Sequence, residues 1–130
     1  EKMYFKIKVY YEDTDSTGRV YHSNYLNYLE RARTEYIYNL GYNHNALFKK
    51  YDLYFVVKKI NIDFKSSAKF EDILNIKSKV LEITKYKIIF NQKILRNEML
   101  LIEAEVVIVS INSMGKLIKI PDEMINKLEI

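Results

Sequence analysis

One long stretch with helical periodicity, followed by four strand-like runs, most constrains how this 130-residue chain can fold. From Ser23 or Asn24 to Leu40, apolar residues recur at three- and four-residue steps, which predicts a helix of about four to five turns. Runs of β-branched and aromatic residues follow at 54–64, 73–84, 86–95 and 99–111. A long helix before a series of strands predicts an α+β fold with an antiparallel sheet, not a parallel α/β fold.

The ends of the long helix and the shorter elements follow from local signals. Ser23 is expected to cap the start of the helix, and Gly41 is expected to end it. The same signals predict a strand over residues 3–11, a short helix from Asn43 to Tyr51, and a terminal helix over 122–128 after Pro121.

The order of the strand-like runs predicts how the sheet is built. We expect four strands in a meander, with Val56, Ile60, Ile62 and Phe64 on one face. Residues 106–111 are almost wholly apolar, which predicts a strand at the sheet centre. Because no repeat or linker interrupts the pattern, residues 1–130 are expected to form a single domain.

Composition excludes several classes of protein. The chain has no Cys, which excludes disulfides, thiolate zinc sites and a cysteine nucleophile. It contains no run of about 18 apolar residues and no signal-peptide pattern, so we expect a cytoplasmic protein, or one peripheral to the inner membrane. The two histidines, His22 and His44, lack a carboxylate cage, which predicts that no metal is bound.

The net charge of +4 raises nucleic acid, acidic lipid and phosphorylated cofactors as partners. No helical stretch carries a dense stripe of Lys and Arg, so the lysines are interpreted as solvated surface residues. Nucleic acid is therefore not expected as a partner.

Functional groups are concentrated in residues 11–25, just before and at the start of the long helix. Asp13, Asp15, Gly18 and His22 all lie in this stretch. A helix start presents unpaired N–H groups and a partial positive charge, which together can polarise a carbonyl group. A carboxylate on a loop folded back at Gly18 would face the same carbonyl, as a nucleophile or as a base toward water. These are the two parts of an acyl-transfer site.

The same residues also have purely structural interpretations. Asp13 and Asp15 are typical of Asx-turns, in which the carboxylate accepts bonds from loop N–H groups. Gly18 needs only a turn to explain it, and a lone His22 is typical of an ordinary surface residue. From the residues alone, both interpretations stay open.

A family resemblance covers almost the whole chain. The residues that carry it are Tyr11-Glu12-Asp13-Thr14-Asp15, Gly18, Val20-Tyr21-His22, Asn24-Tyr25, Glu30-Arg31-Ala32-Arg33-Thr34-Glu35, Phe55-Val56-Val57-Lys58-Lys59 and Glu103-Ala104-Glu105-Val106. Together they resemble the 4-hydroxybenzoyl-CoA thioesterase family. Within it they are most similar to the YbgC-like branch of acyl-CoA thioesterases, which is associated with the Tol–Pal system of Gram-negative bacteria.

The resemblance implies a hotdog fold, in which an antiparallel sheet wraps a long central helix. It also implies homodimers or homotetramers with active sites at the subunit boundary. Asp15 matches the catalytic carboxylate of the family, and whether it acts as nucleophile or as general base stays open. The helix-start N–H that polarises the thioester carbonyl falls at about His22, whose side chain is expected to orient water or to protonate the thiolate.

The substrate contacts are implied in the same way. Gly18, Tyr21 and Tyr25 belong to the motif and are expected to bind substrate, and Lys85 and Lys87 to meet the phosphates of coenzyme A. Solvated surface lysines are the alternative for the last two. Coenzyme A is then part of the substrate, so no retained cofactor is expected.

Three functions are compatible with these residues to different degrees. The expected one is hydrolysis of acyl-CoA with short to medium chains, or of acyl carrier protein conjugates. The alternative is a module that binds acyl carrier protein or a lipid enzyme at the inner membrane, with weak or no catalysis. A hydratase or dehydratase is less attractive, because such enzymes place an Asp–His pair differently at the helix start.

Overall fold

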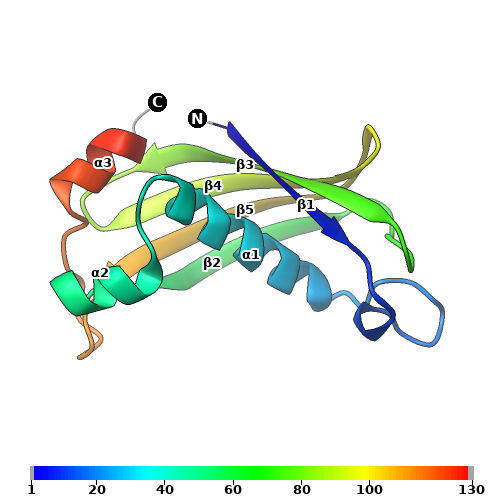
Figure 1. The fold of residues 1–130 in the computed structure, drawn as a ribbon, viewed down its shortest axis with the longest axis horizontal. Helices are drawn as coiled ribbons and strands as arrows, with labels where there is room; N and C mark the ends of the chain where they lie inside the picture. Colours follow the sequence, from blue (N-terminus) through cyan, green and yellow to red (C-terminus); the bar gives the residue numbers. More distant parts are fainter. Residues whose placement is uncertain (1, 129–130) are drawn as a thin grey trace.

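A five-stranded antiparallel sheet forms most of the molecule. The computed structural model describes residues 2–128. The strands are β1 (Lys2–Lys8), β2 (Tyr54–Phe64), β3 (Ile73–Ile83), β4 (Lys87–Arg96) and β5 (Met99–Ile111). The helices are α1 (Asn24–Asn39), α2 (His44–Tyr51) and α3 (Asp122–Leu128), and a 3₁₀ turn η1 covers Tyr11–Asp13. The long helix α1 lies along one face of the sheet (Figure 1), which confirms the predicted α+β class.

The helix α1 buries one face against the sheet. Its buried apolar residues recur at three- and four-residue steps, as the sequence predicted: Tyr25, Tyr28, Leu29, Ala32, Tyr36 and Ile37. The helix ends as predicted at Gly41, whose φ of +97° is readily adopted only by glycine, and whose N–H donates to the carbonyl of Tyr38. The predicted cap is wrong, because Ser23 is itself in the helical conformation and its side chain accepts no capping hydrogen bond.

The strand order is β1-β3-β4-β5-β2, which corrects two predictions. The central strand is β4, and the apolar β5 lies between β4 and the edge strand β2. The four later strands do not form a simple meander, because β2 pairs with β5 and leaves β3 to pair with β1 and β4. The apolar content of a strand depends on which of its faces are covered and not on its place in the sheet, and the central β4 includes Asn91 and Lys93. The pattern therefore did not determine which strand was central.

A β-bulge changes which residues of β2 face the helix. The register shifts between Val57 and Lys59, so Val56 pairs with Val109 whereas Ile60 pairs with Val106. One extra residue moves the following side chains to the opposite face, and the prediction that Val56 shares a face with Ile60 is therefore wrong.

The two short helices agree with the sequence. The Asn43 side chain accepts a hydrogen bond from the N–H of Ala46 at 2.7 Å and caps α2. Met124 and Leu128 of α3 enter the core, and the Lys127 Nζ donates to the carbonyl of Leu40 just beyond the end of α1. Within residues 2–128, no helix is long and apolar enough to cross a membrane.

Candidate functional site

The loop before α1 folds back on itself as a small hairpin. Thr14 forms a β-bridge with Val20, and the N–H of Asp15 donates to the carbonyl of Arg19 at 2.9 Å. The N–H of Gly18 in turn donates to the carbonyl of Asp15, and the φ of Gly18 is +77°, which suits glycine at this turn. Asp15 is therefore held beside the segment that leads directly into the helix.

Only one of the two carboxylate oxygens of Asp15 accepts hydrogen bonds within residues 2–128. Its Oδ1 accepts hydrogen bonds from the N–H of Thr17, at 2.8 Å, and from the Thr17 hydroxyl. Within residues 2–128, no hydrogen bond to its Oδ2 is formed, although the backbone N–H and the charge of Arg19 also lower the pKa of the carboxyl, and the side chain is exposed. The Asx-turn interpretation is thus correct for Oδ1, while Oδ2 remains available to a substrate or a water molecule. The hydrogen bonds from Thr17 lower the pKa of Asp15, so the carboxylate stays ionised to lower pH than an ordinary aspartate.

Replacing Thr17 by Val tests this electrostatic effect. The change removes the hydroxyl donor that most lowers the pKa of Asp15, so that pKa rises toward its usual value. If activity needs the carboxylate ionised, the acid limb of the pH–rate profile shifts to higher pH. Thr14→Val is the matched control, because the Thr14 hydroxyl donates to the carbonyl of Tyr11 and not to Asp15. Profiles that coincide in wild type and Thr17→Val would contradict the prediction.

The start of α1 offers free N–H donors close to this loop. The carbonyl of Asp13 accepts from the N–H of Tyr21 at 3.0 Å and from the Nδ2 of Asn24 at 2.8 Å, which ties the loop to the helix. Within the described chain, the N–H groups of His22 and Ser23 have no acceptor. Unpaired donors at a helix start can stabilise negative charge on a carbonyl oxygen. The sequence did not reveal the tie through the Asp13 carbonyl, because it is a backbone contact.

The side chains of His22 and Tyr21 are both exposed beside these donors. Their ring centroids are 4.5 Å apart, and the imidazole makes no hydrogen bond within residues 2–128. Both rings are accessible to a ligand at the helix start. The roles predicted for His22 and Tyr21 stay predictions.

Tyr25 has a structural role that the motif did not indicate. Its side chain is 3% exposed, and its hydroxyl accepts a hydrogen bond from the N–H of Ala68 at 2.9 Å. Burial raises the pKa of Tyr25 above its usual value. The residue therefore anchors the loop of residues 65–72 to α1, and a substrate contact stays a prediction.

The change Tyr25→Phe separates these two roles. It leaves the buried N–H of Ala68 without an acceptor, which lowers the free energy of unfolding by about 1–3 kcal/mol. Urea denaturation measures this loss, and the KM for substrate is expected to stay close to that of the wild type. An increased KM with unchanged stability would instead assign Tyr25 to substrate binding.

Lys85 and Lys87 lie far from the Asp15 loop in the same chain, and their contact with coenzyme A stays a prediction. The loop follows Lys8, which pairs with Ile73 at the start of β3, whereas the two lysines follow Ile83 at its end. An 11-residue strand spans roughly 30 Å, and Figure 1 shows the two regions at opposite ends of the sheet. The Nζ of Lys87 also lies 3.2 Å from Glu82 Oε2. Contact with coenzyme A at this site would therefore need the lysines of a second copy of the chain.

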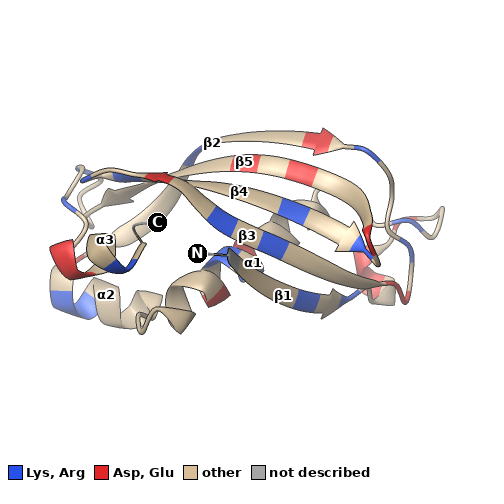
Figure 2. Ribbon diagram, turned by 90° about the horizontal axis from the view of Figure 1, so that it is seen from above, with Lys and Arg blue, Asp and Glu red and all other residues tan. Residues whose placement is uncertain are grey.

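The lysines belong to a broader distribution of charge over the strands. Lys and Arg positions occur along β1, β2, β3 and β4, whereas β5 has acidic positions and no basic one (Figure 2). Positive charge is therefore spread over the sheet, in agreement with the interpretation of the lysines as surface residues.

A cavity of about 400 Å³ lies on the helix side of the sheet, between α1, the start of α2, and strands β2 and β5. It is lined by Glu30, Arg33, Thr34, Ile37, His44, Phe55, Val57 and Ile108. We call it the α1–β2 cavity. Partial burial among these side chains lowers the pKa of His44, and the nearby Glu30 opposes the effect. This cavity could not be predicted from the sequence, because its lining comes from four separate elements.

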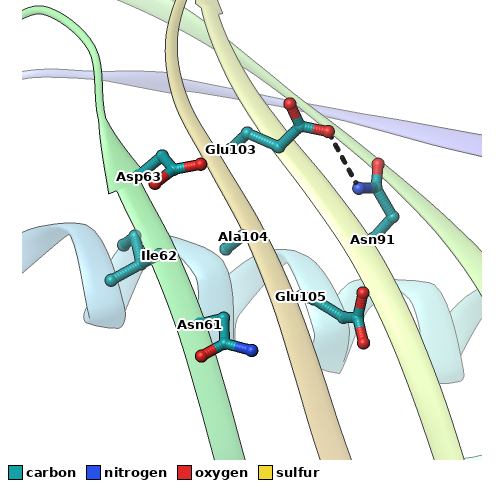
Figure 3. A pocket seen from close by; sticks show the side chains of 7 residues that line it. All are labelled: Asn61, Ile62, Asp63, Asn91, Glu103, Ala104 and Glu105. Carbon is teal, nitrogen blue, oxygen red and sulfur yellow. Dashed lines mark hydrogen bonds between the residues drawn. The ribbon is translucent and has the colours of Figure 1, made fainter.

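A second hollow of about 410 Å³ lies on the opposite face of the sheet, away from α1 (Figure 3). Its polar lining consists of Asn61, Asp63, Asn91, Glu103 and Glu105. The Nδ2 of Asn91 donates to Glu103 at 3.2 Å. In the described part of the chain, no group of three or more side chains is arranged to hold a metal ion. This acidic surface lacks the helix-start donors of the Asp15 loop, so that loop is the better candidate site.

Comparisons with known proteins show to which family the chain is related. Residues 9–128 match the thioesterase-like superfamily. The chain is 41% identical over 113 residues to the acyl-CoA thioesterase YbgC of Haemophilus influenzae, covering 87% of this chain and 82% of that relative. It is 36% identical over 107 residues to the acyl-CoA thioester hydrolase YbgC of Escherichia coli O6:H1, covering 82% of this chain and 79% of the relative.

Solved structures give the same result for the fold. The crystal structure of a probable thioesterase from Bartonella henselae superposes with a TM-score of 0.90 and 34% identity, covering 93% of this chain and 100% of that one. A 4-hydroxybenzoyl CoA thioesterase superposes with a TM-score of 0.92, and its 17% identity bears on the fold alone. Together with the helix-on-sheet architecture, these likenesses confirm the predicted hotdog fold.

Proposed function

The chain belongs to the thioesterase-like superfamily and is a thioester hydrolase, and we propose that it cleaves acyl-CoA with the Asp15 carboxylate beside the start of α1. The observation that carries this proposal is the pairing of two complementary features. The Oδ2 of Asp15 is free, and the N–H groups of His22 and Ser23 lack acceptors within residues 2–128. A thioester carbonyl needs both a donor for its oxygen and a nucleophile for its carbon.

The chemistry follows from the charges of these groups. The thioester oxygen accepts from the helix-start N–H groups, which stabilise the negative charge that develops on it. The carboxylate either attacks the carbonyl carbon or takes a proton from a water molecule that attacks it. When the carboxylate attacks, the thiolate of coenzyme A departs and leaves an anhydride between the acyl group and Asp15, and a water molecule hydrolyses it to the free acid and the restored carboxylate. When water attacks, the thiolate leaves after the water oxygen has bonded to the carbonyl carbon. In both routes the thiolate takes up the proton that the water molecule releases. The low pKa of Asp15 favours the ionised form that both routes require.

A second copy of the chain completes the site in this proposal. The edge strand β2 has 11 residues and leaves Val56 38% and Val57 50% exposed. A long edge strand with exposed apolar side chains is suited to pair with another strand. Pairing of two β2 strands would form a homodimer and would bring the lysines of one copy closer to the Asp15 loop of the other. The proposal places Lys85 and Lys87 of the second copy at the coenzyme A phosphates.

A panel of thioesters tests the function. The purified protein is offered acyl-CoAs from acetyl to palmitoyl and an acyl carrier protein conjugate, and thiol release is followed with a thiol-reactive dye. We expect hydrolysis of short to medium acyl-CoAs. Binding of acyl carrier protein without hydrolysis of any thioester would instead support the binding-module alternative.

A further inference from the structure

The α1–β2 cavity contains a buried positive charge that the proposed chemistry does not use. Arg33 lines this cavity and is only 8% exposed. Its Nη1 donates to the Oε1 of Gln92 at 3.0 Å, and Gln92 Nε2 donates to the carbonyl of Leu29 and to the hydroxyl of Ser78. Gln92 is fully buried, so this network fixes the guanidinium in place.

The guanidinium has unused hydrogen-bonding capacity. Arg33 carries five N–H donors, and its hydrogen bonds within residues 2–128 are confined to Nη1. It forms no ion pair within hydrogen-bond distance of a carboxylate in the described chain, and its one acceptor is a neutral amide. The carboxylate of Glu30 acts on its charge only from farther away and offsets part of the effect of burial on the pKa of Arg33. Burial of a charge is costly unless the charge is paired. A buried arginine that lines a cavity, with Nε and Nη2 free, is therefore suited to bind an anion that enters the cavity.

The remaining lining shows what kind of anion would fit. Ile37, Phe55, Val57 and Ile108 give the cavity an apolar wall, beside which an aliphatic chain can lie. An inorganic anion would leave this wall uncovered. A ligand with both an aliphatic part and a terminal carboxylate would cover the wall and reach the arginine, because the planar guanidinium fork matches a carboxylate.

Resting on the proposed function, we infer that the α1–β2 cavity accepts acyl groups that end in a carboxylate, with Arg33 as the specificity-determining residue. The cavity lies beside residues 30–37 of α1, the helix whose start faces the thioester in the proposed function. Glu30 also lines it and is exposed, so its carboxylate opposes an anionic ligand at the rim. The two residues therefore have opposite effects on such a substrate, and this provides an experimental signature.

The test compares acyl-CoAs with equal numbers of carbon atoms: succinyl with butyryl, glutaryl with valeryl, and adipyl with hexanoyl. The ratio of kcat/KM within each pair reports selectivity for the carboxylate. We expect at least one pair to favour the carboxylate in the wild type. Arg33→Met lowers that ratio at least about tenfold, because a charge-assisted hydrogen bond is lost. Glu30→Gln raises the same ratio. Ratios that do not change in either variant would overturn the inference and leave thioester hydrolysis intact.

Two further measurements keep the outcomes separate. Glu30 is exposed, so the Glu30→Gln variant still gives a result if Arg33→Met does not fold. Asp63→Asn, on the opposite face of the sheet, is the matched control, and we expect it to leave the kcat/KM ratio within each pair unchanged. Free glutarate is also titrated into the wild-type protein while the NMR signal of the Arg33 Nε–H is followed. A shift of this signal supports the carboxylate site even if no thioester is hydrolysed, whereas valerate is expected to leave it in place. If glutarate and valerate have the same effect, the site is not a carboxylate site.

Discussion

Replacing Asp15 by Asn is expected to lower kcat for acyl-CoA hydrolysis about 10²–10⁴-fold, with little change in stability. The amide keeps the shape of the carboxylate but can neither attack a carbonyl carbon nor accept a proton from water. The exposed side chain contributes hydrogen bonds only to its own turn, so the fold should tolerate the change. Thiol release at saturating substrate measures the loss, and thermal unfolding measures stability.

Asp63→Asn is the matched control for Asp15→Asn. It removes an exposed carboxylate from the opposite face of the sheet, in the surface hollow that also contains Glu103. We expect this variant to keep the wild-type rate. Equal rates in wild type and Asp15→Asn would remove Asp15 from the mechanism.

The largest effect on stability is expected from Gln92→Ala. The side chain of Gln92 is fully buried and makes three hydrogen bonds, to Arg33, to Ser78 and to the carbonyl of Leu29. Its loss leaves a buried guanidinium without its acceptor, and a buried polar group left unsatisfied costs about 1–3 kcal/mol, or more when the group is charged. Urea denaturation should show this loss in the free energy of unfolding.

The neighbouring residue gives the control for Gln92→Ala. Asn91 lies on the same strand with its side chain on the opposite face, where it donates to Glu103. Because this bond is only partly buried, Asn91→Ala is expected to cost about 1 kcal/mol. If both variants lose the same stability, the buried network does not have the importance that we assign to it.

Most elements of this fold were predictable because their signals are local. The spacing of apolar residues from Tyr25 to Ile37 indicates which face of α1 is buried. Gly41 indicates where the helix ends, because the backbone there needs a positive φ. The Asn43 cap and Pro121 set the starts of α2 and α3 in the same way. Each of these signals depends on residues within a few positions of one another.

The strand order was not predictable, because pairing partners are far apart in the sequence. The β2 strand pairs with β5 and not with β3, the next strand in the sequence. No feature of residues 54–64 indicates which strand is the partner. The bulge between Val57 and Lys59 could not be predicted from the sequence either, although it determines which apolar residues of β2 face α1.

The candidate site was predictable in part. The acids, Gly18 and the helix start lie close together in the sequence, so their proximity in the fold follows directly. The burial of Arg33 does not, because an arginine in an otherwise charged helical segment is typical of a solvated surface. Only the network with Gln92, 59 residues later, shows that this side chain is held in the core.

The central claim is that a thioester binds with its carbonyl oxygen at the start of α1 and its carbonyl carbon against residue 15. A crystal structure of the Asp15→Asn protein with an unhydrolysed acyl-CoA tests this directly. We expect the carbonyl oxygen to accept a hydrogen bond from the N–H of His22 or Ser23, with the side chain of residue 15 facing the carbonyl carbon. A thioester bound away from this helix start, with residue 15 still turned into its own loop, would contradict the claim.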